Sequence, residues 1–307
     1  MNDSCRYLFG PVVSRRLGRS LGVDLIPAKT CSISCIFCQL GPTRNPTLER
    51  REYVPTEQVI AELRAWIRAG GETDFITLAG SGEPTLHLHF DRVLKFLEPH
   101  PFRTALLSNG TLFTDPAVRR GAAHADVVKL SLSAWDRTSF ERIHHPHPDL
   151  DFEPMMKGYR DFRSLYRGAL WLEVFVVPGL NSGEEQVKRI AARAKEIRPD
   201  RVQLNTAVRP AAEAGVRAAS PDKLQRLAAL FDPPAEIAAP RAHGGTVSLP
   251  LSAQTLTGIL QRHPATAAQL AEMIGHPEEA VRELLEDMVR AGRCHTREQK
   301  DETFFTR

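Results

Sequence analysis

Apolar and polar positions follow two alternating periods through the first three quarters of the chain. Short apolar runs rich in β-branched residues predict strands, and each is followed by residues with the helical spacing of apolar positions. Six such strand–helix units predict an α/β fold with a parallel sheet and right-handed crossovers, open or partly closed. The expected strands are 21–26, 74–78, 103–107, 127–132, 170–177 and 201–204, and the expected helices are 56–69, 90–97, 115–122, 138–144, 152–166, 182–197 and 220–231.

The pattern changes where Pro, Gly and Ala accumulate, at 232–234 and 239–245. This shift predicts a domain boundary, with a first domain at 1–235 and a second at 236–307. Helical patterns at 255–262, 266–274 and 278–291, followed by possible strands at 293–297 and 302–307, have the order of a winged-helix-like domain.

The third helix of this second domain is acidic. It carries Glu278, Glu279, Glu283, Glu286 and Asp287 against Arg282 and Arg290. A helix that enters a DNA groove should be basic, so we expect no sequence-specific DNA binding and interpret the domain as a substrate or partner clamp.

Composition narrows the class of protein further. The chain has 307 residues, 42% of them hydrophobic, and a net charge of +3, as a globular protein of two domains would have. It contains no apolar run of the roughly 18 residues that cross a bilayer and no leader-like N-terminus, so we expect a cytoplasmic location and no membrane contact. The five cysteines do not suggest a disulfide framework.

Three of these cysteines carry the most specific signal in the chain. Cys31, Cys35 and Cys38 form a C-x3-C-x2-C array directly after the first expected strand. Three thiolates suit three irons of a [4Fe–4S] cluster and leave the fourth iron open, whereas structural zinc requires four protein ligands. The remaining Cys5 and Cys294 are expected to be ordinary unpaired thiols, and a second cluster is the alternative.

Two further motifs follow at the ends of the next two expected strands. Gly80-Ser-Gly-Glu-Pro-Thr85 comes after 74–78, and Ser108-Asn-Gly-Thr111 comes after 103–107. Together with the cysteine array, these motifs resemble the radical S-adenosylmethionine (AdoMet) superfamily. The strings 9–27, 38–41 and 203–210 are similar to the branch of wyosine-base (tRNA) synthases.

The resemblance implies a partial parallel (β/α)6 barrel that holds a [4Fe–4S] cluster and AdoMet. It also implies an external low-potential electron donor such as flavodoxin or ferredoxin. Glu83 would accept from the AdoMet amino group, Asn109 would contact its carboxylate or ribose, and Phe37 would lie near the adenine. The full set of expected AdoMet contacts is Phe37, Gly80, Gly82, Glu83, Ser108, Asn109, Ser131, Ser133 and Asn205, and the metal ligands are Cys31, Cys35 and Cys38.

The substrate is less defined. The resemblance implies that a 5′-deoxyadenosyl radical abstracts hydrogen from a substrate, and an RNA base is favoured because residues 1–51 hold eight Lys or Arg against three acids. We expect Arg15, Arg16 and Arg19 near the cluster mouth. A peptide or small metabolite is the alternative substrate, and an iron–sulfur redox sensor that regulates transcription is the alternative function.

Strand position adds a few more residues to the candidate site. Lys129, Glu173, Asn205 and Arg209 lie in or after expected strands, where they could contact substrate or cofactor. The tract His144-His-Pro-His147 could bind a metal in isolation, but its loop position favours exposure to solvent.

Overall fold

The computed structural model describes residues 6–14, 16–237, 249–299 and 302–307. An eight-stranded sheet with the order β1-β2-β3-β4-β5-β6-β7-β8 forms the centre of the molecule. β1 is antiparallel to β2, and every later pair is parallel. The strands are β1 (Leu8–Ser14), β2 (Gly18–Val23), β3 (Phe75–Leu78), β4 (Arg103–Ser108), β5 (Val127–Ser131), β6 (Ala169–Val176), β7 (Arg201–Thr206) and β8 (Glu236–Ile237).

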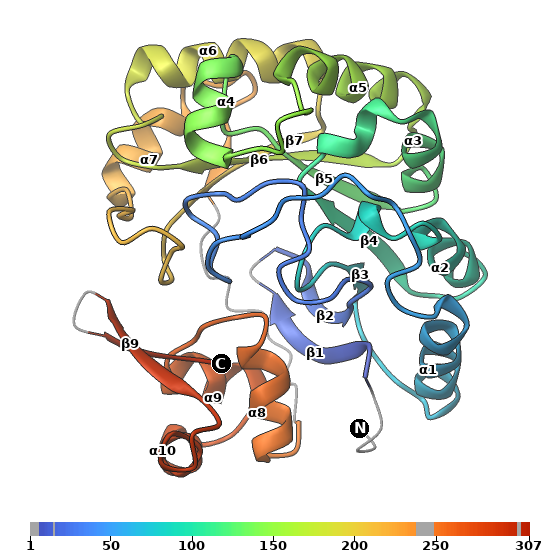
Figure 1. Cartoon of the computed structure of the whole chain (residues 1–307), viewed down its shortest axis with the longest axis vertical. Helices are drawn as coiled ribbons and strands as arrows, with labels where there is room; N and C mark the ends of the chain where they lie inside the picture. The colour runs from blue at the N-terminus through green and yellow to red at the C-terminus, as the bar shows by residue number, and fades with distance from the viewer. Residues whose placement is uncertain (1–5, 15, 238–248, 300–301) are drawn as a thin grey trace.

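Helices cover the convex face of this curved sheet (Figure 1). The helices lie in the connections between successive strands, with both α4 and α5 between β5 and β6, so the predicted α/β class with a parallel sheet is confirmed. The sheet stays open, because β1 and β8 lie at its two edges and do not pair with each other. The helices are α1 (Thr56–Arg68), α2 (Phe90–Leu97), α3 (Pro116–Ala122), α4 (Arg137–His144), α5 (Phe152–Leu165), α6 (Glu184–Ile197) and α7 (Pro221–Ala228), with short 3-10 turns η1 (Pro84–Leu86) and η2 (Thr111–Thr114).

The first edge of the sheet differs from the sequence prediction. β1 was not expected, and the strand expected at 21–26 occupies Gly18–Val23. The β1–β2 register shifts between Phe9 and Val12, around the Gly10-Pro11 pair, so the apolar alternation that identifies a strand is interrupted. β2 ends before Asp24, whose carboxylate accepts from Ser81 instead of continuing the strand.

Side chains that alternate along the strands build two separate layers. Ile76, Leu106 and Val128 point to the helices and join the main core. Their neighbours Phe75 and Ala105, one residue earlier, belong to a second apolar cluster on the concave face. That cluster comprises Leu17, Phe75, Ala105, Val127 and Trp171, near the amino ends of the strands. It closes one end of the concave face and leaves the carboxyl ends for the site.

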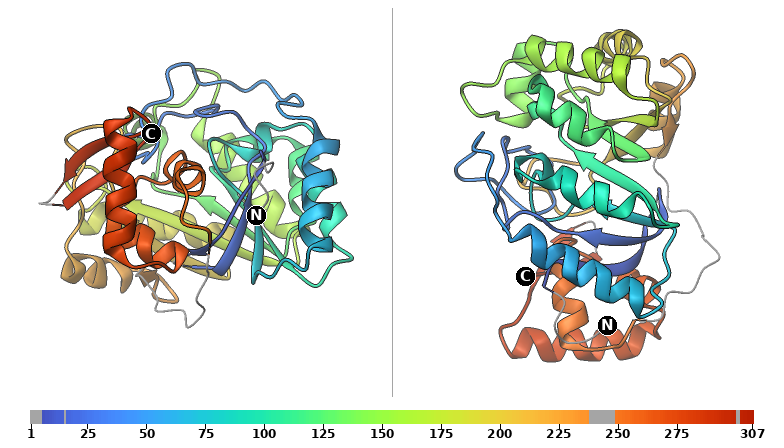
Figure 2. Two further views of the ribbon diagram at one scale, coloured as in Figure 1. Left: turned by 90° about the horizontal axis from the view of Figure 1, so that it is seen from below. Right: turned by 90° about the vertical axis from the view of Figure 1, so that its right-hand side faces the viewer.

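The C-terminal residues, called the C-terminal domain below, surround an apolar cluster separate from the main core and lie beside β1 (Figures 1 and 2). Leu256, Leu270, Leu285 and Phe305 lie in this cluster, and Val12 of β1 joins them. The element order of three helices and a hairpin is the one expected from the sequence. The elements are α8 (Ala253–Leu260), α9 (Ala267–Ile274), α10 (Glu278–Arg290) and the antiparallel pair β9 (His295–Gln299) and β10 (Glu302–Thr306).

Among the helices that the structure describes, none has the length and apolar character needed to cross a lipid bilayer.

Candidate active site

The loop between β2 and α1 carries the three clustered cysteines across the carboxyl ends of the strands. Backbone hydrogen bonds hold it on both sides. Glu83 N donates to Thr30 O at 3.0 Å on the β3 side, and Ser34 N donates to His144 O at 2.9 Å on the α4 side. The loop is therefore fixed between the Gly80–Thr85 turn and the end of α4.

The cysteines and the two downstream motifs line one cavity of about 210 Å³. The structure thus brings together three motifs that the sequence places far apart. The lining includes the thiols of Cys31, Cys35 and Cys38 and, of the expected AdoMet contacts, Gly80, Gly82, Glu83, Ser108, Asn109 and Ser131.

The three thiols suit a cluster better than a single ion. In the described residues, no three His, Cys, Asp or Glu side chains converge as the ligands of one metal ion do. Each thiolate of a [4Fe–4S] cluster binds a different iron, so the thiols surround the cluster and need not meet at a point. Donor chemistry and placement along one cavity wall therefore fit such a cluster.

The electrostatic environment favours the protonated form of the Cys31 and Cys35 thiols unless a positively charged ligand binds. Burial, followed by the charge of Glu83, raises the pKa of Cys31 to about 12. Burial and the neighbouring Cys38 and Cys31 likewise raise the pKa of Cys35 well above its ordinary value. A bound metal deprotonates a coordinating thiol outright, so iron would add positive charge to that of Lys29, whose Nζ lies 3.3 Å from Cys38 Sγ.

Glu83 is buried at the floor of this cavity, and its carboxylate already has protein donors. Oε1 accepts from Thr85 N, Thr85 Oγ1 and Ser108 Oγ at 3.0, 2.6 and 2.7 Å, and Oε2 accepts from Asn109 N at 2.7 Å. Glu83 therefore has four protein donors without any ligand. Burial nevertheless raises the pKa of Glu83. Because Oε2 accepts one described hydrogen bond, it keeps capacity for a cationic amino group.

Asn109 connects the second motif to the cysteine loop. Its Nδ2 donates to Ser32 Oγ at 3.0 Å and lies 3.4 Å from Cys31 Sγ, while its Oδ1 accepts from Thr111 N at 2.9 Å. The hydroxyl of Tyr159 supports the same turn and contacts Asn109 O at 3.0 Å. Asn109 therefore positions the first cysteine, a role that the sequence did not indicate.

The two glycines of the first motif permit close packing of protein against protein. A Cβ on Gly82 would lie 1.9 Å from Thr30 O, and one on Gly80 would lie 2.5 Å from the Asp24 carboxylate carbon. We expected these glycines to admit AdoMet. In the structure they first allow the motif to pack against the cysteine loop and the end of β2.

Three expected AdoMet contacts do not line the cavity. Phe37 stacks on Phe175 with ring centroids 3.9 Å apart. Ser133 Oγ accepts from Phe175 N at 2.9 Å, and Asn205 Nδ2 donates to Glu173 Oε1 at 3.3 Å. These residues support the neighbouring strand ends in the structure.

A buried charge cluster occupies the concave face below the cavity. Glu173 on β6 pairs with Lys129 on β5 at 2.7 Å and with Arg16 from the β1–β2 turn. Burial alone would raise the pKa of Glu173, but the charges of Arg16 and Lys129 outweigh it and hold that pKa well below its ordinary value. The strand positions of Lys129 and Glu173 were a useful guide, since both side chains face the barrel interior.

The basic N-terminal residues do not gather at the cluster mouth as expected. Arg16 points to Glu173, while Arg19 pairs with Asp74 and Glu72 at the amino end of β3. The hairpin of β1 and β2 puts this segment at the end of the sheet opposite the cysteine loop. Arg15 lies outside the described residues.

His144 is a site residue that the sequence analysis placed incorrectly. It is buried, and its Nδ1 lies 3.1 Å from Cys35 Sγ. Burial, with a smaller contribution from His145, lowers the pKa of His144 to about 3, so the ring is neutral. The expected solvent exposure holds for His145 but not for His144, because His144 is the last residue of α4 and faces the cysteine loop.

Several contacts of the cysteine loop had no sequence signal. Lys29 Nζ lies 3.3 Å from Cys38 Sγ. Gln39 Nε2 donates to Arg262 O at 2.9 Å, and its Oε1 accepts from Arg209 Nη1 at 3.1 Å. The Gln39–Arg262 contact joins the loop to the C-terminal domain over 223 positions of sequence separation.

The other two cysteines are outside this site. Cys294 is buried in the C-terminal core, where its thiol lies 3.8 Å from Leu285 O. Cys5 lies outside the described residues.

The comparisons with known proteins define the class. Residues 25–197 match the family described as the Radical SAM superfamily. This match spans the cysteine loop, both downstream motifs and strands β3 to β6. The chain belongs to the radical SAM superfamily and is an enzyme of that class, in which a [4Fe–4S] cluster and AdoMet are the general cofactors.

Particular relatives carry names that assign no reaction to this chain. A UPF0026 protein of Methanocaldococcus jannaschii is 32% identical over 73% of this chain and 70% of its own length. A UPF0026 protein of Helicobacter pylori is 38% identical over 66% of this chain and 67% of its own length. A protein of Brachyspira hyodysenteriae named GTPase Obg is 33% identical over 94% of this chain, which spans only 43% of that protein. The phosphate-binding sequence G-x-x-x-x-G-K-S/T does not occur in this chain, so the GTPase name has no counterpart here.

Solved structures confirm the fold. A structure of TYW1 with a lysine–pyruvate adduct bound superimposes with a TM-score of 0.56 at 18% identity, covering 71% of this chain and 74% of that one. Streptococcus suis SuiB bound to its precursor peptide SuiA gives a TM-score of 0.52 at 17% identity over 67% of this chain and 44% of that chain. At these identities the likeness concerns the fold alone.

Proposed function

We propose that this enzyme holds a [4Fe–4S] cluster on Cys31, Cys35 and Cys38 and cleaves AdoMet beside it. The observation that carries the proposal is the single cavity shared by the three thiols, Glu83 and Asn109. When bound and reduced by an external donor such as flavodoxin or ferredoxin, the cluster supplies the electron that cleaves AdoMet to methionine and a 5′-deoxyadenosyl radical, which abstracts hydrogen from the substrate.

The chain's own residues would bind AdoMet and orient the cysteines that hold the cluster. Glu83 is placed to accept from the AdoMet amino group through Oε2, and Ser108 holds the opposite oxygen. Asn109 and His144 fix the Cys31 and Cys35 side chains from two sides of the loop. The stacked rings of Phe37 and Phe175 cover the apolar side of the loop, which helps to exclude water from reactive species.

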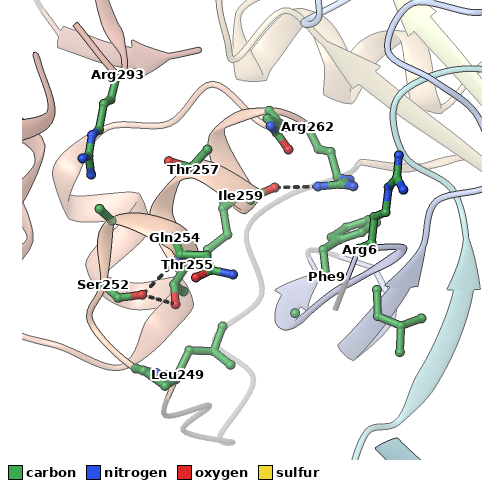
Figure 3. Close-up of a pocket in the computed structure, with 16 residues that line it drawn as sticks. Arg6, Phe9, Leu249, Ser252, Gln254, Thr255, Thr257, Ile259, Arg262 and Arg293 are labelled. Carbon is green, nitrogen blue, oxygen red and sulfur yellow. Dashed lines mark hydrogen bonds between the residues drawn. The ribbon is translucent and has the colours of Figure 1, made fainter. Parts of the chain in front are cut away.

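An RNA base is the substrate class that we favour. A cavity of about 510 Å³ lies between β1 and α8 (Figure 3). Arg6 and Arg293 line it together with polar side chains of α8, while Arg262, which also lines it, is paired with Asp24. A second cavity of about 610 Å³ shares Arg6 and Arg262 with it and extends to Lys29 at the cysteine loop. Positively charged grooves that follow a phosphate backbone are typical of single-stranded nucleic-acid binding.

The arginines of these two cavities support the RNA hypothesis in place of the N-terminal arginines that the sequence analysis named. Arg16 and Arg19 are engaged by carboxylates, so they contribute little to a surface for phosphates. A peptide or small metabolite remains the alternative substrate. An iron–sulfur sensor is disfavoured because parts of both motifs, residues 80–83 and 108–109, line the cysteine cavity, which a sensor without AdoMet would not require.

The proposal is tested with protein reconstituted without oxygen and reduced with dithionite. We expect one cluster per chain and slow formation of 5′-deoxyadenosine from AdoMet. Glu83→Ala should reduce AdoMet affinity by about tenfold or more, since hydrogen bonds to charged groups contribute roughly 1.5–3 kcal/mol, while iron content is retained. Cys35→Ala should lose the cluster, and Cys294→Ala should keep it.

The RNA hypothesis has its own measurement. Fluorescence anisotropy should show salt-dependent RNA binding that the variant Arg6→Gln/Arg293→Gln weakens and the exposed control Arg120→Gln does not. Equal affinity of both variants would remove the support for RNA. A full cluster that never yields 5′-deoxyadenosine, with or without cell extract, would favour the sensor instead.

A further inference from the structure

Each of the three cysteine sulfurs at the site lies against one side-chain nitrogen. The pairs are His144 Nδ1 with Cys35 Sγ at 3.1 Å, Lys29 Nζ with Cys38 Sγ at 3.3 Å, and Asn109 Nδ2 with Cys31 Sγ at 3.4 Å. Lys29 and Asn109 also line the cysteine cavity, whereas His144 is not among its described lining residues. His144 therefore contacts the loop without forming part of the wall of the cavity.

Backbone hydrogen bonds hold the end of α4 against the cysteine loop. Ser34 N donates to His144 O at 2.9 Å, and Ile36 N donates to Ile143 O at 3.1 Å. Both residues that flank Cys35 are thus bonded to the last two residues of α4. The distance between His144 and Cys35 is therefore set by the fold of the chain.

Aromatic side chains surround the imidazole ring. The centroid of the His144 ring lies 5.6 Å from that of Phe37 and 5.3 Å from that of Phe140, and His144 is 3% exposed. These rings restrict access of water to the contact with Cys35. A hydrogen bond in such surroundings is electrostatically stronger than one in water.

The chemistry of a metal-bound cysteine determines which atom donates in this contact. Cysteine coordinates iron as the thiolate, which has no proton. In protein that holds a cluster, the contact is therefore a hydrogen bond from His144 Nδ1–H to Cys35 Sγ, with the ring proton on Nδ1. Reduction increases the negative charge of the cluster and its thiolates, so an N–H donor stabilises the reduced form more than the oxidised form.

We infer that His144 is a positioning residue that raises the reduction potential of the cluster through its hydrogen bond to Cys35. The inference rests on the proposed function, because it requires a [4Fe–4S] cluster on the three cysteines. Hydrogen bonds to sulfur are among the determinants of cluster potentials. The bond from His144 makes the cluster easier to reduce by the external electron donor.

Redox potentiometry measures this effect without turnover. Full-length protein is reconstituted without oxygen and titrated with dithionite and redox mediators in the absence of AdoMet, while EPR spectroscopy follows the reduced cluster. His144→Phe keeps an aromatic ring but removes the donor. It should shift the reduction equilibrium about tenfold towards the oxidised cluster, which for one electron lowers the midpoint potential by about 59 mV.

The same substitution at another histidine is the control. His124 precedes β5 at the amino ends of the strands, and its Nδ1 contacts Glu98. His124→Phe should have the wild-type potential. An equal potential in His144→Phe and His124→Phe would overturn the inference.

A conservative variant separates the hydrogen bond from packing. The amide nitrogen of asparagine is bonded to Cγ, as Nδ1 of histidine is, so His144→Asn can still donate to Cys35. It should recover part of the potential that His144→Phe loses. A loss as large as that of His144→Phe would assign the effect to packing and would also overturn the inference.

A measurement on the unsubstituted protein decides the case in which the variants bind no cluster. Protein with ¹⁵N in its histidine rings is reduced and examined by pulsed EPR, and we expect a weak coupling between the cluster and a histidine nitrogen. A reduced cluster without this coupling would contradict the inference alone. Wild-type protein that binds no cluster would instead contradict the proposed function on which the inference rests.

Discussion

Arg262 donates its Nε–H to Asp24 Oδ2 at 2.8 Å, across the junction of the two domains, with side-chain exposures of 10% and 7%. The Arg262 guanidinium carbon lies 4.5 Å from the centroid of the Phe9 ring. Figure 3 shows both residues in the pocket between β1 and α8. Asp24 also accepts from Ser81 Oγ at 2.5 Å. The C-terminal domain is thereby linked to the turn that begins the Gly80–Thr85 motif.

Replacing either Arg262 or Asp24 should lower the stability of the protein, because the charge of the other residue would remain buried. We expect Arg262→Met to lower the free energy of unfolding by about 3 kcal/mol, at the lower end of values for broken buried pairs since Ser81 still donates to Asp24. Urea denaturation of the iron-free protein at neutral pH measures it. The double variant Asp24→Asn/Arg262→Met should recover part of the loss.

The exposed pair of Arg282 and Glu278 on α10 provides the control. Arg282→Met should cost about 0.5 kcal/mol or less, as is usual for helix-surface pairs. If Arg262→Met were no more destabilising than Arg282→Met, the buried pair would have no structural role.

Gly82 should not tolerate a side chain. A Cβ at this position would overlap Thr30 O, a backbone atom of the cysteine loop, so Gly82→Ala should destabilise the protein by about 1–3 kcal/mol and lower its iron content after reconstitution. Gly215→Ala is the matched control, since a Cβ there meets no atom within 4 Å. Equal iron content in the two variants would show that the close contact does not position the loop.

Glu173 should contribute to stability in a pH-dependent manner. Because its pKa in the folded state lies below the ordinary value of 4.5, its contribution is present above about pH 4.5 and is lost as pH falls from there towards the folded-state pKa. Glu173→Gln should therefore destabilise the protein at pH 7 and make the loss of stability between pH 5 and 3 less steep. The comparison is Glu184→Gln, at an exposed position of α6. Parallel pH profiles for wild type and Glu173→Gln would contradict the charge assignment.

The acidic face of α10 should prevent the protein from binding duplex DNA. Glu279, Glu283 and Glu286 are exposed on this helix, where a DNA-reading helix would carry Lys or Arg. Full-length protein should show no sequence-selective shift with a pool of duplex oligonucleotides at about 0.15 M salt. Tight, selective binding that Arg297→Gln in the hairpin abolishes would instead identify a DNA-binding domain.

Local patterns were sufficient to predict most of the fold. The parallel strands β3 to β7 and their helices follow from apolar periodicity, because each buries one continuous face. β1 was missed because Gly10-Pro11 and a register shift interrupt its alternation, and β8 because Glu236–Ile237 is too short for any period to show. In a parallel sheet, functional residues lie at the carboxyl ends of the strands. This rule also predicted that Glu83, Ser108 and Asn109 would lie at one site, and they line one cavity.

Contacts between distant segments were not predictable in this way. Arg262 and Asp24 are 238 positions apart, and nothing near either residue specifies the other. His144 was expected in solvent because the histidine tract was placed in a loop, yet the end of α4 turns it toward Cys35. Partners of this kind are fixed by how whole elements pack, after local structure has formed.

The side chain of Gln39 has a consequence for how the enzyme matures. It spans from the residue after Cys38 to the α8–α9 turn, where it donates to Arg262 O and His263 Nδ1. Order in the cysteine loop and docking of the C-terminal domain are therefore coupled. Insertion of iron into the newly folded chain should slow amide hydrogen exchange in α8 and α9, although neither helix supplies a ligand of the metal, so the C-terminal domain should dock firmly only after the chain has received its cluster.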